Sequence, residues 1–186
     1  MNERELSILD AAQSVFAKYG VSKTTMSDIA EAAGVARQTV YNAFATKNDI
    51  LRAAVRVETE RSIAEVRAAW EVASTLEERI EIFHKFGPLR WYQMVEDHPD
   101  LADLWEGLHH IAAEEIHKGK LAWLEMFVQM FERQDVTPVD PGLTHKDLAD
   151  FLYSTGKHAK FETDSFEHMK RRLHICKVAM LNLVQD

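Results

Sequence analysis

The sequence from Thr24 to Leu51 reads TTMSDIAEAAGVARQTVYNAFATKNDIL, and its apolar residues have the spacing of two short helices that cross through a tight turn. Ile29 and Ala30 precede Gly34 by five and four residues, and Val40 follows it by six. Ala30 is small enough for the second helix to approach the first closely. Gly34 suits a left-handed turn residue, a conformation that a Cβ atom would penalise. The stretch therefore predicts a helix-turn-helix.

A helix-turn-helix reads DNA by placing its second helix in the major groove, while the first helix crosses the backbone. Here the second helix is expected to begin near Arg37. Arg37 can pair bidentately with guanine, and Gln38 can pair in the same way with adenine. The candidate reading residues of this helix are Arg37, Gln38, Thr39, Tyr41 and Asn42.

The pattern T-x-x-x-I-A-x-x-A-G-V-x-x-x-T-V-Y-x-x-F-x-x-K in this stretch resembles the tetracycline-repressor (TetR) family of bacterial regulators. The resemblance extends motif by motif over about Ile8 to Val55. It implies that Thr25 and Lys47 contact DNA phosphate, and that Tyr41 contacts phosphate or a thymine methyl group. Ala36 stands where the family often has Ser or Thr, so the recognition helix is expected to lack its usual side-chain cap.

Composition is that of a soluble globular protein, with 46% hydrophobic and 28% charged residues in a chain of 186. The single cysteine excludes a disulfide framework and suits a reducing compartment. No apolar run reaches eighteen residues and the N-terminus lacks a secretory pattern, so a cytoplasmic protein without a membrane span is expected. The net charge of −8 comes entirely from residues after 52, because residues 1–52 carry equal numbers of acidic and basic side chains.

Few glycines or prolines interrupt the chain, which favours an all-α fold of nine helices. Helix starts are indicated by a capping residue followed three positions later by an acidic residue. These pairs are Thr25 with Asp28, Thr46 with Asp49, Thr75 with Glu78, Asp97 with Asp100, and Thr144 with Asp147. The predicted helices span 5–19, 26–33, 37–44, 47–72, 76–96, 99–117, 119–134, 144–161 and 164–184. Gly87-Pro88 should kink or break the fifth of them.

Two domains are predicted, a three-helix DNA-binding domain at 1–46 and a helical bundle for ligand binding and dimerisation at 47–186. Nothing breaks the predicted helix 47–72, so we expect it to belong to both domains. No strand is indicated by the sequence pattern.

The bundle is rich in large, soft side chains between residues 83 and 131. By resemblance, the middle helices enclose a small-molecule site, and aromatic and methionine side chains suit an apolar or aromatic ligand. The candidate ligand-binding residues are Phe83, Phe86, Trp105, His109, Trp123, Phe127 and Met130. The alternative is that these side chains only fill the core.

Two E-x-x-H pairs, Glu81 with His84 and Glu114 with His117, allow a different reading of the bundle. In helical bundles such pairs can bind two iron ions together with glutamates from two further helices. Chance pairs are common among nine histidines and thirty acidic residues, and nothing identifies the remaining ligands. We therefore expect no metal, no cofactor and no enzymatic activity, with a di-iron-like enzyme as the alternative.

The last predicted helix carries apolar residues at alternating steps of three and four, which is the pattern of a helix-packing seam. In the resembled family the last two helices pair with their copies to form a dimer. The candidate dimer-interface residues are Phe151, Phe166, Met169, Leu173, Cys176 and Met180. From the pattern alone, this seam could equally pack within its own subunit.

These observations together predict a sequence-specific, DNA-binding transcriptional regulator. We expect a homodimeric repressor that a small effector releases from a palindromic, double-stranded operator.

Overall fold

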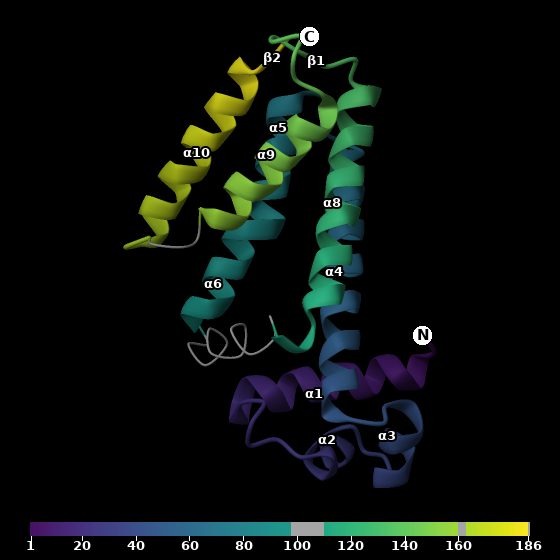
Figure 1. The fold of residues 1–186 in the computed structure, drawn as a ribbon. Helices are drawn as coiled ribbons and strands as arrows, with labels where there is room; N and C mark the ends of the chain where they lie inside the picture. Colours follow the sequence, from purple (N-terminus) through teal and green to yellow (C-terminus); the bar gives the residue numbers. More distant parts are fainter. Residues whose placement is uncertain (98–109, 160–162, 186) are drawn as a thin grey trace. The chain divides into compact units, whose positions relative to one another are not determined.

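The computed structural model describes residues 1–97, 110–159 and 163–185, and these ranges are predominantly helical (Figure 1). The helices are α1 (Glu3–Tyr19), α2 (Met26–Ala32), α3 (Arg37–Ala43), α4 (Lys47–Trp70), α5 (Leu76–His84), the π-helical segment η1 (Lys85–Leu89), α6 (Arg90–Asp97), α8 (Ala113–Arg133), α9 (His145–His158) and α10 (Phe166–Asn182). The strands are β1 (Thr137–Pro138) and β2 (Val184–Gln185). The predicted all-α class is confirmed.

Short polar motifs determine where several helices begin. Complete capping boxes open α2 at Thr25, α5 at Thr75 and α9 at Thr144, and the same pair of hydrogen bonds joins Thr46 to Asp49 ahead of α4. In each, the threonine hydroxyl accepts a backbone N–H three residues on, and the carboxylate accepts the threonine N–H. The fifth predicted pair, Asp97 with Asp100, lies outside the described residues.

The chain folds into two compact units, each with its own hydrophobic core. The first contains Met1–Thr59 and Val95–His117, and the second contains Glu60–Met94 and Lys118–Asp186. Helix α4 contributes residues to both units, as expected for the predicted helix 47–72. The division at residue 46 stays a prediction.

The core of the first unit is formed where α1, α2, α3 and the beginning of α4 meet. Its most buried side chains belong to Ile8, Leu9, Ile29, Val40 and Ile50. These residues recur at helical spacing, so each helix buries one face and leaves the opposite face polar. The exposed face of α3 is therefore available for contacts outside the domain.

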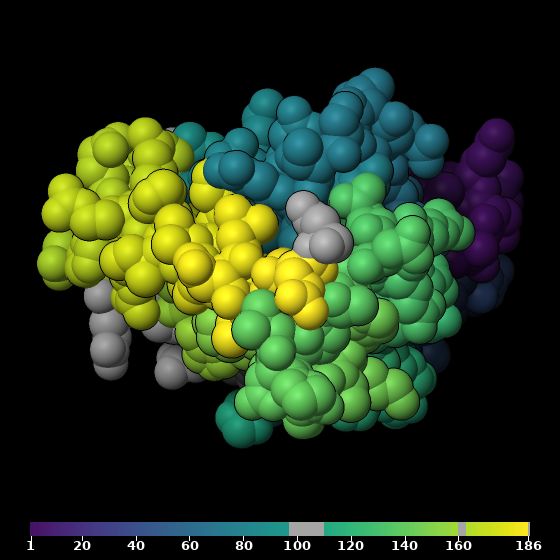
Figure 2. All heavy atoms as spheres, turned by 90° about the horizontal axis from the view of Figure 1, so that it is seen from above, coloured from purple at the N-terminus to yellow at the C-terminus, as the bar shows by residue number. Residues whose placement is uncertain are grey.

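The second unit packs α10 against both α5 and α9, and the three helices lie side by side in Figure 1. Its core contains Ile80, Phe127, Phe131, Leu148 and Met180, all fully buried. The two strands pair antiparallel, with Thr137 opposite Gln185. In Figure 2 the yellow C-terminal residues lie accordingly against the green segment that follows α8.

Three details differ from the sequence prediction or refine it. The predicted boundary between helices 99–117 and 119–134 was wrong, because α8 continues through Gly119. A single glycine does not end a helix, since it costs only about 1 kcal/mol relative to alanine. The strands β1 and β2 were not expected, since each has only two residues and its partner lies far away in sequence. The interruption at Pro88 is confirmed as the π-helical segment η1.

Of the helices within the described ranges, none combines the length and the apolar character that crossing a membrane requires.

Candidate functional site

The turn between α2 and α3 has the geometry that its sequence predicts. Gly34 adopts a φ of +64°, in the left-handed region, and the N–H of Val35 donates to the carbonyl of Ala30 at 3.0 Å. Ile29 and Val40 are fully buried and join the two helices to the core. The helix-turn-helix is thus a rigid unit whose second helix presents its other face to solvent.

The exposed face of α3 carries four of the predicted reading residues, arranged as two pairs. Arg37 donates from Nη2 to the hydroxyl of Tyr41 at 3.2 Å, and its guanidinium lies 5.3 Å from the centre of that ring. Gln38 donates from Nε2 to Oδ1 of Asn42 at 2.9 Å. Tyr41 is 37% exposed, which contradicts a role as a core residue. Thr39, the fifth predicted reading residue, is half-buried beside these pairs.

The N-terminal starts of α2 and α3 differ in how they are capped. Thr25 caps α2 while its side chain stays exposed, so it combines a structural role with access to solvent. Ala36 is the N-cap residue of α3 and makes no side-chain capping hydrogen bond, as expected for alanine. Both helix starts present backbone N–H groups, which are favourable partners for phosphate.

Lys47 has a structural role that its sequence position did not reveal. Its ammonium group donates hydrogen bonds to the carbonyls of Val21 and Thr24, the latter at 2.9 Å. The hydroxyl of Thr24 is buried and donates to the carbonyl of Gly20 at 2.7 Å. Lys47 therefore holds the segment before α2 against the start of α4.

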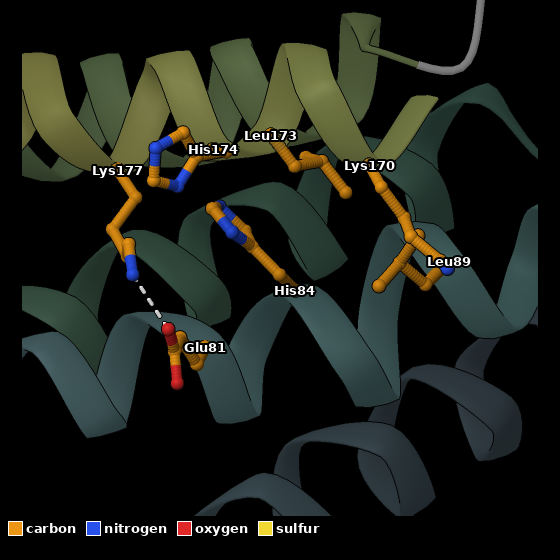
Figure 3. A pocket seen from close by; sticks show the side chains of 7 residues that line it. All are labelled: Glu81, His84, Leu89, Lys170, Leu173, His174 and Lys177. Carbon is orange, nitrogen blue, oxygen red and sulfur yellow. Dashed lines mark hydrogen bonds and ion pairs between the residues drawn. The ribbon is translucent and has the colours of Figure 1, made fainter. Parts of the chain in front are cut away.

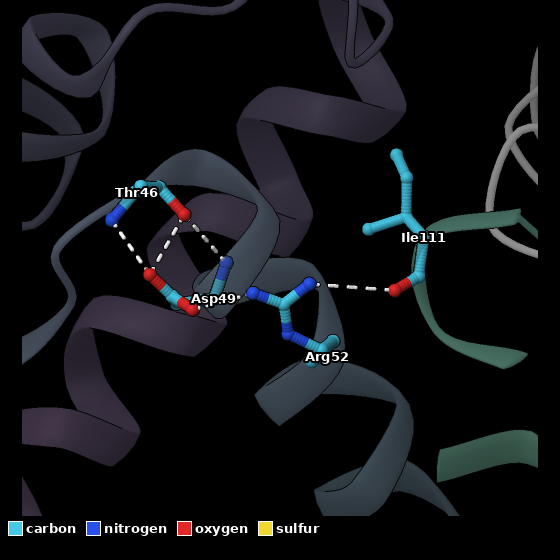
Figure 4. Close-up of polar contacts among 4 residues, drawn as sticks. All are labelled: Thr46, Asp49, Arg52 and Ile111. Carbon is cyan, nitrogen blue, oxygen red and sulfur yellow. Dashed lines mark hydrogen bonds and ion pairs between the residues drawn. The ribbon is translucent and has the colours of Figure 1, made fainter. Parts of the chain in front are cut away.

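A polar network at the start of α4 reaches the segment before α8 within the same unit (Figure 4). Asp49 accepts hydrogen bonds from the N–H and hydroxyl of Thr46 at 2.8 and 2.7 Å. Arg52 donates to the other carboxylate oxygen of Asp49 at 2.6 Å and, at 3.4 Å, to the carbonyl of Ile111. Hydrogen bonds from Thr46 and Arg52 hold the pKa of Asp49 below its ordinary value.

The candidate ligand residues of the second unit form a closely packed aromatic cluster. Phe83, Trp123, Phe127 and Met130 are buried, and Phe86 is half-buried. The ring centres of Phe83 and Phe127 lie 4.8 Å apart, and those of Phe83 and Trp123 lie 5.5 Å apart. The remaining candidates, Trp105 and His109, lie outside the described residues.

The candidate dimer residues divide between the interior and the surface of the second unit. Met169, Leu173 and Met180 are buried within the chain itself, whereas Phe151, Phe166 and Cys176 are half-buried. On its exposed face α10 presents two other apolar side chains. These are Ile175, 61% exposed, and Val178, 43% exposed.

Sequence periodicity also missed a buried lysine next to Cys176. Lys177 is only 8% exposed, and its ammonium donates to Glu77 at 2.6 Å and to Glu81 at 2.5 Å. These contacts raise the pKa of Lys177, with the hydrogen bond to Glu77 contributing most. An ion pair of this kind fixes the position of α10 along α5, because a lysine shifted by one helical turn would leave both carboxylates unpaired.

The described residues give the alternative of an iron site no support. Glu81, from the first E-x-x-H pair, is ion-paired with Lys177. Within the described ranges, no three or more His, Cys, Asp or Glu side chains lie close enough together to hold a metal ion.

Comparison with known proteins identifies the helix-turn-helix region. Residues 8–54 match the family model described as "Bacterial regulatory proteins, tetR family". The HTH-type transcriptional regulator YezE of Bacillus subtilis, itself uncharacterised, is 33% identical over 79 residues, which are 42% of this chain and 41% of YezE. The HTH-type transcriptional regulator TtgR of Pseudomonas putida is 43% identical over 51 residues, 27% of this chain and 24% of TtgR. The chain thus aligns with less than half the length of these curated relatives.

Solved structures share the fold over nearly the whole chain. The fatty acid degradation regulator FadR from Bacillus halodurans has a TM-score of 0.66 at 19% identity, covering 95% of this chain and 96% of its own. SmeT, in a complex with triclosan, has a TM-score of 0.67 at 19% identity, covering 100% of this chain and 93% of its own. FadR from Bacillus subtilis, in complex with stearoyl-CoA, has a TM-score of 0.63 at 18% identity, covering 92% and 96%. At these identities the likeness concerns the fold.

Proposed function

We propose that this chain, whose residues 8–54 match the tetR family model, is a DNA-binding transcriptional regulator of that family, a homodimeric repressor released from a palindromic operator by a small ligand. The observation that carries the proposal is the exposed face of α3, where Arg37, Gln38, Tyr41 and Asn42 point away from a well-packed core. A polar face on a rigid helix is what reading base edges in a major groove requires.

In the proposed complex, Arg37 and Gln38 read base edges, because both lie in the first turn of α3 and can form bidentate contacts with a base. Tyr41, Asn42 and Thr39 complete the reading face. Thr25 and Lys47 contribute phosphate contacts at the edges of the domain. Residues 1–52 have no net charge, so the affinity for DNA rests on this geometry and on the two DNA-binding domains of the proposed dimer more than on a general positive field.

The proposed dimer uses the exposed face of α10. Ile175 and Val178 are one turn apart on this helix and expose apolar surface to solvent. The half-buried Phe151, Phe166 and Cys176 extend the apolar character of the last two helices. Burying such a surface against its copy is favourable at about 25 cal/mol per Å² of apolar area. Two-fold symmetry would then match a palindrome with half-sites about 34 Å apart.

The proposed effector is apolar or aromatic and binds near the aromatic cluster of Phe83, Phe86, Trp123, Phe127 and Met130. Support comes from the composition of this cluster and from the complexes of SmeT with triclosan and of Bacillus subtilis FadR with stearoyl-CoA. Release from DNA requires the ligand to bind the DNA-incompetent state more tightly, typically by about 1–3 kcal/mol of coupling.

Selecting binding sites from random duplexes tests the DNA half of the proposal. We expect an enriched inverted repeat whose half-sites are one helical turn apart, centre to centre. Failure to enrich any sequence, or enrichment of a single half-site, would contradict dimeric operator binding. Adding compounds found in a thermal-shift screen then tests release. A compound that raises the melting temperature but leaves operator affinity unchanged would contradict the repressor mechanism.

A further inference from the structure

A pocket of about 170 Å³ opens between α5, η1 and α10 in the second unit (Figure 3). Leu89 and Leu173 give it an apolar part, and His84 and His174 contribute imidazole rings from opposite walls. The other lining residues are Glu81, Lys170 and Lys177. It is separate from the set of residues proposed above for the apolar effector.

His84 is the unusual residue of this pocket. The side chain is only 5% exposed, and among the described residues its Nε2 atom has no hydrogen-bond partner. Nε2 is itself shielded from solvent, but it belongs to a residue that lines the pocket. Buried polar groups are almost always hydrogen-bonded, so an unpaired nitrogen here indicates a missing partner. In Figure 3 the ring of His84 extends from α5 toward α10.

The charges around His84 favour a partner that accepts hydrogen bonds. Burial, and secondly the positive charge of Lys177, lower the pKa of His84 to about 4. The ring is therefore neutral at physiological pH and can carry its hydrogen on Nε2. The ammonium of Lys177 donates to Glu77 and Glu81 and has a third hydrogen to donate.

A metal cation does not fit this environment. The charge that acts on His84 is the positive charge of Lys177, which repels cations, and Glu81 is already ion-paired. A second ammonium group, that of Lys170, lines the same pocket and is 46% exposed in its ion pair with Glu167. Both ammonium groups are ion-paired with glutamates, but each keeps hydrogens to donate, and with the unpaired imidazole they are suitable donors for an anion.

We propose that this pocket is a binding site for a small carboxylate. Its volume corresponds to only about six water molecules of liquid, at about 30 Å³ each, so the ligand has a few non-hydrogen atoms. One carboxylate oxygen accepts the Nε2 hydrogen of His84 once the imidazole has turned this shielded nitrogen toward the pocket, and the other accepts from Lys177 or Lys170. The short hydrocarbon part of the ligand contacts Leu89 and Leu173.

The test is a titration of the full-length chain with sodium propionate, followed by nitrogen NMR of the histidine rings. We expect a saturable shift of the His84 Nε2 signal, with a dissociation constant in the millimolar range. Sodium chloride at equal ionic strength and propionamide, which has the same shape without the charge, are expected to leave that signal in place. A shift that grows linearly, or one that chloride or propionamide reproduces, would overturn the proposal.

Variants locate the site independently of the histidine signals, through line broadening of the propionate methyl resonance. His84→Leu places an apolar side chain in this buried position, removes the imidazole N–H and is expected to abolish the broadening. Lys170→Met is expected to weaken binding at least threefold, whereas Lys146→Met, an exposed lysine on α9 outside the pocket, leaves it unchanged. Undiminished broadening with a folded His84→Leu variant would refute the site. None of these measurements involves DNA, so their outcome is independent of the proposed function.

Discussion

Gly156 in α9 lies directly against the aromatic cluster, and replacing it with alanine tests how tightly that cluster is packed. A Cβ atom at this position would lie 2.8 Å from Cε1 and 3.1 Å from Cζ of Phe83. Phe83 is buried, and its ring is in contact with the rings of Trp123 and Phe127. The ring cannot move away from the new methyl group without disturbing these neighbours.

The expected magnitude follows from two opposing effects. Overpacking a well-filled core costs about 1–3 kcal/mol, and the confined ring of Phe83 places Gly156→Ala in the upper half of that range. Alanine in a helix interior is favoured over glycine by about 1 kcal/mol. The variant should therefore be less stable by about 1–2 kcal/mol. For a chain of 186 residues this corresponds to a melting temperature about 2–8 °C lower.

Urea and thermal unfolding, followed by circular dichroism at one fixed protein concentration, measure this difference. The same substitution in a Phe83→Leu background is the matched control, because the smaller side chain leaves room for the methyl group. There Gly156→Ala should be neutral or stabilising, which gives a coupling energy of about 1 kcal/mol or more. A Gly156→Ala protein as stable as the parent would refute the reasoning and would show that the cluster is loosely packed.

Three further predictions concern the reading helix, the domain that carries it and one capping box. Gln38→Ala should weaken operator binding by about 1–3 kcal/mol per half-site without changing the free energy of unfolding. Gln93→Ala, which changes an exposed glutamine on α6, is the control and should alter neither operator binding nor unfolding. Equal operator affinities of the Gln38→Ala variant and the parent in an anisotropy titration would contradict base reading by Gln38. Lys47→Met should lower the free energy of unfolding by about 1–3 kcal/mol, because two carbonyls lose a charged donor, and an unchanged urea midpoint would argue against this. Hydrogen bonds from Thr144 lower the pKa of Asp147, so its stabilising effect is present above the unfolded-state pKa and is lost as the pH falls through the folded-state value. Asp147→Asn should therefore lose less stability than the parent between about pH 5 and pH 3, as measured by thermal unfolding.

Features that depend on neighbours within a few residues could be predicted from the sequence. A capping box needs only a threonine and an acidic residue three positions apart, and the predicted boxes at Thr25, Thr75 and Thr144 are present. The turn at Gly34 and the burial of Val40 are equally local, because helix spacing determines them. The fold class and the exposed polar face of α3 follow from such features.

Features that depend on residues far apart could not be predicted in this way. Lys47 bonds to Val21, 26 residues earlier, and no sequence pattern distinguishes such a contact from a solvated charge. Lys177 pairs with Glu77, 100 residues earlier. The apolar seam of α10 placed Cys176 on the buried face, but the long side chain of Lys177 is the more deeply buried of the two, because its ammonium has partners there.

The candidate ligand-binding residues show a different limit of prediction from the sequence. Aromatic composition identified Phe83, Trp123 and Phe127 as one group, and the structure brings them together. Composition alone could not reveal the pocket beside His84, because its walls come from segments that meet only in the folded unit. Periodicity assigns a residue to the inside of a helix bundle, but it does not show whether a polar atom there has a partner.

If the chain is the proposed regulator, the two side-chain pairs on α3 have a consequence for how it could acquire a new operator. Arg37 is bonded to Tyr41, and Gln38 is bonded to Asn42, so a side chain that turns toward a base must exchange one hydrogen bond for another. Changing only one member of a pair therefore alters both the contact it makes and the orientation of the member that remains. We expect mutational paths to new operator sequences to change positions 38 and 42 together, and positions 37 and 41 together. A library randomised in these pairs should yield altered specificities that single-site libraries miss.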